Sequence, residues 1–340
     1  MVFADFLEWT IKSGILLLLL VTGFAYTTYY ERKVLARIQM RYGPNRAGPF
    51  GVLQPLADGL KLIFKEELIP DHSDKFIFVL APIVTVIPAL VIMAVIPWGE
   101  SVMMFGRDVF LGITDINVGV LYIMSVASVA VYGITLAGWA SNNKYALMGG
   151  LRSAAQMISY EIALGLGFIP PILFAGSMSL SDIVAGQMNS VWYVVLSPIG
   201  ALVFFIAVLA EVNRAPFDTP EAEQELTAGY HTEYSGMKFA LFFMAEYIKM
   251  SAVSAITATL YFGGFHGPFV SQFPWLGPIY LFIKILIGLF LMIWIRATFP
   301  RIRYDRLMAF GWKVLLPVAL ANALITAIVI VVLREFGIMV

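Results

Sequence analysis

The chain has no cysteine, few charged residues and only three histidines among its 340 residues. Without cysteine it forms no disulfide, performs no thiol chemistry and holds no cysteine-ligated iron–sulfur cluster. Charged residues make up 13% of the sequence, about half the share that is usual in a soluble domain. The formal net charge is zero, so we expect no nucleic-acid partner.

Long apolar segments are abundant instead. Hydrophobic residues account for 60% of the chain and the mean hydropathy is +0.85. Apolar runs long enough to cross a bilayer recur throughout. These features predict an all-α polytopic membrane protein, with a single integral membrane domain over residues 1–340. About eight transmembrane helices are expected, at Lys12–Tyr30, Phe76–Trp98, Asn117–Gly138, Ala154–Gly176, Val191–Ala210, Phe239–Tyr261, Trp275–Phe299 and Trp312–Arg334.

The loops between these spans differ sharply in positive charge. Lysine and arginine concentrate in the loops near residues 31–75, 139–153, 211–238 and 300–311. The opposite side offers only Lys12, Arg107 and Arg334. The positive-inside rule therefore predicts cytoplasmic (or matrix) loops at those four places and both termini on the periplasmic (or intermembrane) side.

The first of these loops contains an amphipathic segment. Between residues 53 and 66, apolar and charged side chains alternate at helical spacing, but the segment is too short and too charged to span a bilayer. We expect an interfacial helix on the membrane surface. A helix packed on a partner protein is the alternative.

Acidic residues gather around one predicted membrane boundary. A run that begins at Glu211 follows the fifth span, and Glu233 lies further along the same loop. Glu161, Glu246 and Lys284 fall inside predicted spans. Ionisable groups at such depth are costly, which favours proton or cation handling. The structural alternative is that they pair to hold helices together.

Other chemistries have little support. His72, His231 and His266 fall in three different loops without the short spacing of a metal site. The acids after the fifth span lack the glycine-containing loop of a calcium site. We found no dinucleotide or P-loop fingerprint, so we expect no cofactor bound by this chain.

Four stretches are specific enough to indicate a family. They are Glu31–Leu35 with Gln39–Gly48 and Leu53–Glu66, then Arg152–Glu161, Ala210–Glu225 and Pro300–Met308. In sequence they resemble the H subunit of proton-pumping NADH–quinone oxidoreductase, respiratory complex I, whose mitochondrial counterpart is NADH dehydrogenase subunit 1. The resemblance covers the whole chain in order.

The resemblance implies a quinone-binding membrane subunit that couples quinone reduction to proton translocation. It implies electrons from NADH, passed through FMN and iron–sulfur clusters of partner subunits, with no redox centre in this chain. Residues expected at the quinone tunnel are Glu31, Arg32, Arg41, Asp58, Arg214, Asp218, Phe243 and Arg296. Residues expected in proton coupling are Glu161, Glu211, Glu221, Glu223, Glu225, Glu233 and Glu246.

Alternatives remain at several of these positions. Arg32 and Arg41 would also suit phospholipid phosphate or a neighbouring subunit, and Phe243 would also suit plain packing. The implied partners are quinone, phospholipids, peripheral-arm subunits at the quinone site, and small and antiporter-like membrane subunits. We expect the bacterial inner membrane, with the mitochondrial inner membrane as the alternative. An equivalent subunit of a hydrogenase or photosynthetic complex, or a free-standing proton/cation antiporter, is the competing function.

Overall fold

Helices dominate the computed structural model, which describes residues 2–104, 107–219 and 227–336. The long helices are α1 (Val2–Ile38), α3 (Lys75–Ile92), α4 (Gly119–Ala140), α5 (Lys144–Ala175), α10 (Gly236–Tyr261), α11 (Leu276–Thr298) and α13 (Leu316–Glu335). Shorter ones are α2 (Gln54–Ile63), α6 (Leu180–Asn189), α7 (Tyr193–Leu196), α8 (Pro198–Glu211) and α12 (Tyr304–Phe310). Single turns of 3-10 helix lie at Pro49–Gly51, Met93–Val95 and Gly229–His231. A π-helical segment, Gly311–Leu315, joins α12 to α13.

The predicted all-α membrane fold is confirmed. Within the described residues, seven helical stretches are long and apolar enough to cross a membrane, and they coincide with seven of the eight expected spans. Several begin at polar caps. Asp74 accepts a hydrogen bond from the amide of Ile77 at the start of α3, and Asn143 accepts one from the amide of Tyr145 at the start of α5. Such caps satisfy amide groups that the first helical turn leaves open.

The fifth expected span differs from the prediction. It consists of the four-residue α7 and the 14-residue α8, separated at Ser197. Pro198 explains the break, because proline lacks an amide hydrogen and disfavours helical geometry in the residue before it. Ser197 is accordingly non-helical, at φ −135° and ψ 71°. At 1.5 Å per residue α8 is about 21 Å long, too short to cross about 30 Å of hydrocarbon alone.

Regular structure also occurs in segments that were expected to be loops. Strands β1 (Ser101–Met104) and β2 (Arg107–Phe110) form an antiparallel hairpin in which Ser101 pairs with Phe110.

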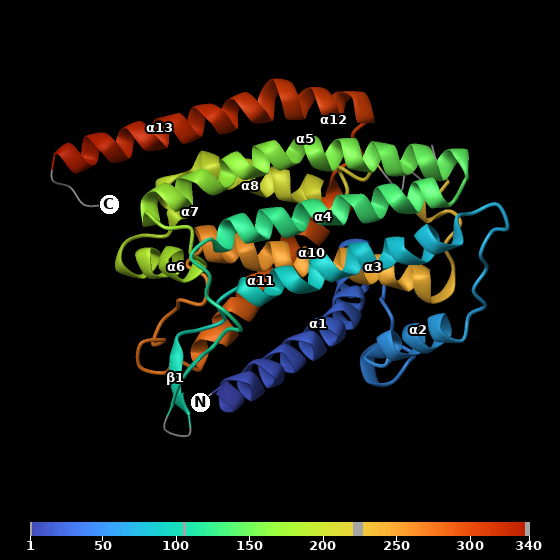
Figure 1. Ribbon diagram of the computed structural model, residues 1–340, viewed down its shortest axis with the longest axis horizontal. Helices are drawn as coiled ribbons and strands as arrows, with labels where there is room; N and C mark the ends of the chain where they lie inside the picture. Colours follow the sequence, from blue (N-terminus) through green and yellow to red (C-terminus); the bar gives the residue numbers. More distant parts are fainter. Residues whose placement is uncertain (1, 105–106, 220–226, 337–340) are drawn as a thin grey trace.

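Helix α2 has no buried residue and extends away from the bundle (Figure 1). Its bounds match the amphipathic segment predicted from the sequence. Both alternatives for that segment, membrane surface and partner protein, remain open.

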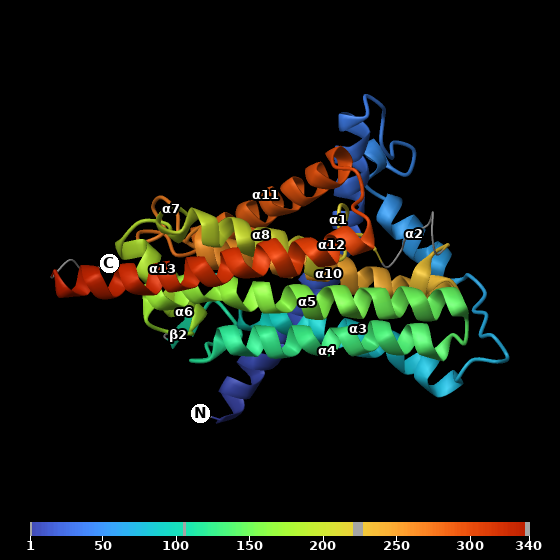
Figure 2. The same ribbon diagram turned by 90° about the horizontal axis from the view of Figure 1, so that it is seen from above.

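The bundle has two distinct ends. In Figure 1, α3, α4, α5 and α13 run side by side, while α1 and α11 cross them obliquely. The start of α1, the hairpin and the end of α13 lie at one end, and α2 and the turn between α4 and α5 lie at the other. Figure 2 shows the same division from above.

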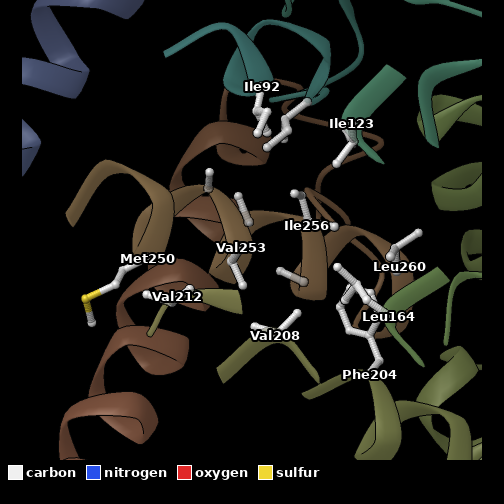
Figure 3. Packing of buried hydrophobic residues seen from close by; sticks show 14 of the residues in the cluster. Ile92, Ile123, Leu164, Phe204, Val208, Val212, Met250, Val253, Ile256 and Leu260 are labelled. Atoms are coloured by element: carbon white, nitrogen blue, oxygen red, sulfur yellow. The ribbon is translucent and has the colours of Figure 1, made fainter. Parts of the chain in front are cut away.

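Helix α10 occupies the centre of the core. It packs against α1, α3, α8 and α11, and it is the most deeply buried of the seven membrane-length stretches in the described residues. Figure 3 shows its side chains Val253 and Ile256 among residues of α3, α4, α5 and α8. Because α10 is enclosed by these helices, polar residues on it must find partners on its neighbours.

Candidate functional site

A buried cluster of charges surrounds Arg214, in the segment that follows α8. The Arg214 guanidinium nitrogen Nε lies 2.6 Å from Oε1 of Glu246, and Nη1 lies 3.5 Å from Oε1 of Glu31. Arg296 pairs with the same Glu31 oxygen. The guanidinium carbon also lies 4.6 Å from the ring centroid of Tyr247. These five residues, here called the Arg214 cluster, carry two positive and two negative charges.

Four separate segments bring the Arg214 cluster together. Glu31 lies in the last third of α1, Glu246 and Tyr247 lie in α10, and Arg296 lies in the last turn of α11. Arg214 is only 5% exposed and Glu31 only 3%. Charges this deep require pairing, because each alone would lose several kcal/mol of hydration.

Arg214 remains a cation despite its burial. Burial alone would lower the pKa of Arg214, but the carboxylates of Glu246 and Glu31 outweigh that effect and raise this pKa above its usual value. Among the described residues, Oε2 of Glu31 and Nη2 of Arg214 are buried without a hydrogen-bond partner. Buried polar atoms of this kind are places where water or a polar ligand binds.

A second polar group lies further into the bundle. Nζ of Lys249 is 2.6 Å from Oε1 of Glu211; the Glu211 side chain is buried and that of Lys249 is mostly so. Ser128 of α4 donates a hydrogen bond to Glu161 of α5. A cavity of about 40 Å³ is lined by Glu211 and Lys249 and also by Glu246 of the Arg214 cluster. It has room for about three water molecules, so a hydrated path between the two groups is feasible.

An apolar cavity lies between three helices that also supply members of the Arg214 cluster. It has a volume of about 560 Å³ and is lined by α1, α10 and α11. Its lining includes Tyr30 and Ile248, the chain neighbours of Glu31 and Tyr247. An apolar chamber beside a few convergent polar groups is typical of a site for a small hydrophobic molecule.

The remaining polar candidates make contacts nearer the surface. Arg32 pairs with Asp58 of α2 at 2.7 Å, and its side chain is half exposed. Arg41 is exposed and donates a hydrogen bond to Gln39 at 2.7 Å. Glu233 accepts a hydrogen bond from Asn143. These pairs belong to the loop end of the bundle.

Comparison with known proteins decides the family. Residues 11–327 match the family model described as NADH dehydrogenase. The chain belongs to this family. The H subunit of NADH-quinone oxidoreductase from Protochlamydia amoebophila is 54% identical over 306 residues, covering 90% of this chain and 92% of the relative. The first of two such H subunits from Geobacter sulfurreducens is 49% identical over 337 residues, covering 96% and 95%. The H subunit from Thermomicrobium roseum is 49% identical over 326 residues, covering 93% and 94%.

The resemblance to the H subunit of complex I is therefore confirmed. This NADH dehydrogenase family member is an integral membrane subunit of an enzyme complex, NADH–quinone oxidoreductase, and its partners are the other subunits of that complex.

The structure brings some of the expected site residues together and leaves others apart. Glu246 and Arg214, assigned by resemblance to different sets, are in direct contact. Phe243 packs against Phe239, with ring centroids 4.5 Å apart, and belongs to an aromatic row on α10. Asp218 is partly buried and acts electrostatically on Glu246. Glu221, Glu223 and Glu225 lie outside the described residues.

Three residues of this NADH dehydrogenase site were absent from the sequence-based assignment. Tyr247 faces the Arg214 guanidinium, Lys249 neutralises Glu211, and Ser128 hydrogen-bonds to Glu161. Lys249 carried a visible signal, because it follows Glu246 by one helical turn. A serine and a tyrosine inside apolar spans carry no such signal, since both are common there as packing residues.

Proposed function

We propose that this subunit binds quinone beside the Arg214 cluster and couples quinone reduction to proton translocation through its buried acids. The main observation in support of this proposal is that Arg214 contacts both Glu31 and Glu246. Tyr30, the chain neighbour of Glu31, lines the apolar cavity, and Glu246 lines the small cavity together with Glu211. Arg214 would thereby link the quinone side to the acid chain.

The apolar cavity suits the chemistry of quinone. An isoprenoid tail requires an apolar passage, and the head group gains negative charge or protons when it is reduced. Arg214 and Arg296 would supply the cations that favour an anionic reduced head group. Electrons would reach the head group from iron–sulfur clusters of partner subunits, because this chain has no cysteine to ligate one.

The acid chain suits transfer of the resulting charge change. Within the Arg214 cluster, neutralising or adding one charge changes the electrostatic energy of every other charged member. The 40 Å³ cavity then offers water between Glu246 and the Glu211–Lys249 pair. We propose Glu161, with its Ser128 partner, as the next member.

We also propose the orientation that the charge distribution predicts, with both termini on the periplasmic side of a bacterial inner membrane. The three relatives named above come from bacteria. The start of α1 and the end of α13 lie at one end of the bundle, in keeping with this proposal (Figure 1).

Glutamine substitutions test the proposed coupling. In the assembled complex, Glu161→Gln and Glu246→Gln should impair proton pumping and quinone reduction, while NADH oxidation by a hydrophilic artificial acceptor stays unchanged. Glu8→Gln is the matched control, because Glu8 pairs with Lys12 near the start of α1, far from the buried acids. Full proton pumping per NADH in both buried variants would overturn the proposal.

A further inference from the structure

One glutamine side chain fastens the segment that carries Arg214. Gln156 lies in the N-terminal half of α5 and has no exposed surface. Its amide nitrogen donates hydrogen bonds to the main-chain oxygens of Ala210 and Phe217, each at 2.8 Å. Its side-chain oxygen accepts a hydrogen bond from the hydroxyl of Thr219.

A second contact one helical turn earlier reinforces this attachment. Asn213 donates a hydrogen bond to the hydroxyl of Ser153 at 3.2 Å, and its side-chain oxygen lies 3.1 Å from the Gln156 amide nitrogen. Asn213 has φ 56°, a left-handed conformation that asparagine tolerates better than most residues. One face of α5 therefore holds the segment on both sides of Arg214.

We propose that Gln156 is the positioning residue that holds Arg214 between Glu31 and Glu246. Its identity follows from the contacts. Two carbonyl oxygens accept hydrogen bonds from its amide nitrogen and one hydroxyl donates to its oxygen, and a primary amide serves both in a single plane. A carboxylate here would put an oxygen against two carbonyls. An apolar side chain would leave these carbonyls with only the local main-chain donors of Asn213 and Thr219, and no hydrogen bond to α5.

The effect on turnover rests on the proposed function, but the attachment does not. Moving the main chain at Arg214 away from α5 requires the hydrogen bonds of Gln156 to break. Gln156 thereby restrains the segment between Glu211 and Thr219, although it touches none of the charges itself.

A second buried glutamine provides the matched control. Gln187 of α6 is 2% exposed and donates a hydrogen bond to the carbonyl of Thr259 at 2.9 Å. It accepts one from the amide of Gly263, also at 2.9 Å. Gln187 thus does the same structural work as Gln156, but it joins α6 to the C-terminal end of α10.

Hydrogen exchange on the purified complex tests the attachment. Gln156→Met should accelerate amide exchange within residues 212–219 by about 30-fold, the effect of losing two ordinary hydrogen bonds. Gln187→Met should leave exchange there at the wild-type rate. Equal exchange in the two variants would overturn the proposal. Should Gln156→Met fail to assemble, Gln156→Glu preserves the volume and is expected to show the same local acceleration.

A double-mutant cycle tests whether Gln156 acts through Arg214. Gln156→Met should lower quinone turnover about 10-fold or more, because small misplacements of a charged group are costly in catalysis. In an Arg214→Lys background the same substitution should add less than about 2-fold, whereas Gln187→Met should have the same effect in both backgrounds. Independent, multiplicative effects of Gln156→Met and Arg214→Lys would overturn the proposed role. Wild-type turnover in both Arg214→Lys and Glu246→Gln would overturn the proposed function, and the exchange comparison would still decide the attachment.

Discussion

Replacing Arg214 by methionine removes the cation between two buried carboxylates. Glu246 loses its partner at 2.6 Å, whereas Glu31 keeps its ion pair with Arg296. Removing one partner of a buried ion pair costs about 3–5 kcal/mol, because the remaining charge is left uncompensated. Since one of the two carboxylates keeps a partner, we expect the low end, about 3 kcal/mol. That is a factor of roughly 100 in the population of correctly folded subunit.

The assay is the melting temperature and yield of the purified complex. Arg214→Met should lower both, and adding Glu246→Gln should restore much of the loss, because the double variant contains no unpaired charge at this contact. Arg303→Met is the control: Arg303 pairs with Asp305 at the surface, and both side chains are mostly exposed. An exposed pair of this kind contributes less than about 1 kcal/mol.

Two results would refute this reasoning. The first is an Arg214→Met complex as stable as the Arg303→Met control. The second is a double variant less stable than Arg214→Met alone, because that would show that Glu246 stabilises the fold without its cation. In either case the Arg214 cluster would not be an electrostatically coupled unit.

Three further outcomes follow from single contacts. Lys284→Met should lower the melting temperature of the complex by an amount equivalent to about 3 kcal/mol, because the ammonium donates hydrogen bonds to the carbonyls of Phe262, Gly264 and His266 at 2.7–2.8 Å. Arg32→Met should cost less than about 1 kcal/mol in the same measurement, and a larger loss would mean that Arg32 does more than form its half-exposed ion pair. Burial lowers the pKa of His231 to about 3, so the unfolded chain binds the extra proton and stability falls as the pH drops below about 6.5. The loss reaches about 2 kcal/mol at pH 5 relative to pH 8, and an unchanged pH dependence of melting in His231→Phe would contradict it.

The spans were predictable because hydropathy acts over long segments. A stretch of about 20 apolar residues has few alternatives to a membrane helix. The break in the fifth expected span at Ser197 was not predicted, because hydropathy averaged over a long segment does not reveal the effect of a single proline. The hairpin at residues 101–110 was missed because four-residue strands carry too little periodicity to separate them from loop.

The sequence indicated several residues of the candidate site, but not which of them contact one another. The resemblance supplied Glu31, Arg214 and Arg296 without indicating that they meet. Glu31 and Arg296 are 265 positions apart, and they meet because α1 packs against α11 in the folded bundle. Gln156 belongs to the stretch Arg152–Glu161, but the sequence did not indicate its role. Two of its partners are main-chain oxygens, which any residue at positions 210 and 217 would supply.

Under the proposed function, the contact between Arg214 and Glu246 decides how a charge change travels. Two unit charges about 4 Å apart interact by on the order of 4 kcal/mol at an effective dielectric constant of 20, enough to shift a protonation equilibrium by nearly three orders of magnitude. Glu31 is among the charges that act on Glu246, so a charge change at Glu31 is felt at Glu246 while every helix stays in place. Electrostatics alone, however, acts equally in both directions. Direction requires that the contact be broken at one stage of the cycle, and the segment held by Gln156 is the element whose movement would break it. Locking that segment to α5 should consequently abolish net pumping while the charges of the Arg214 cluster remain in place.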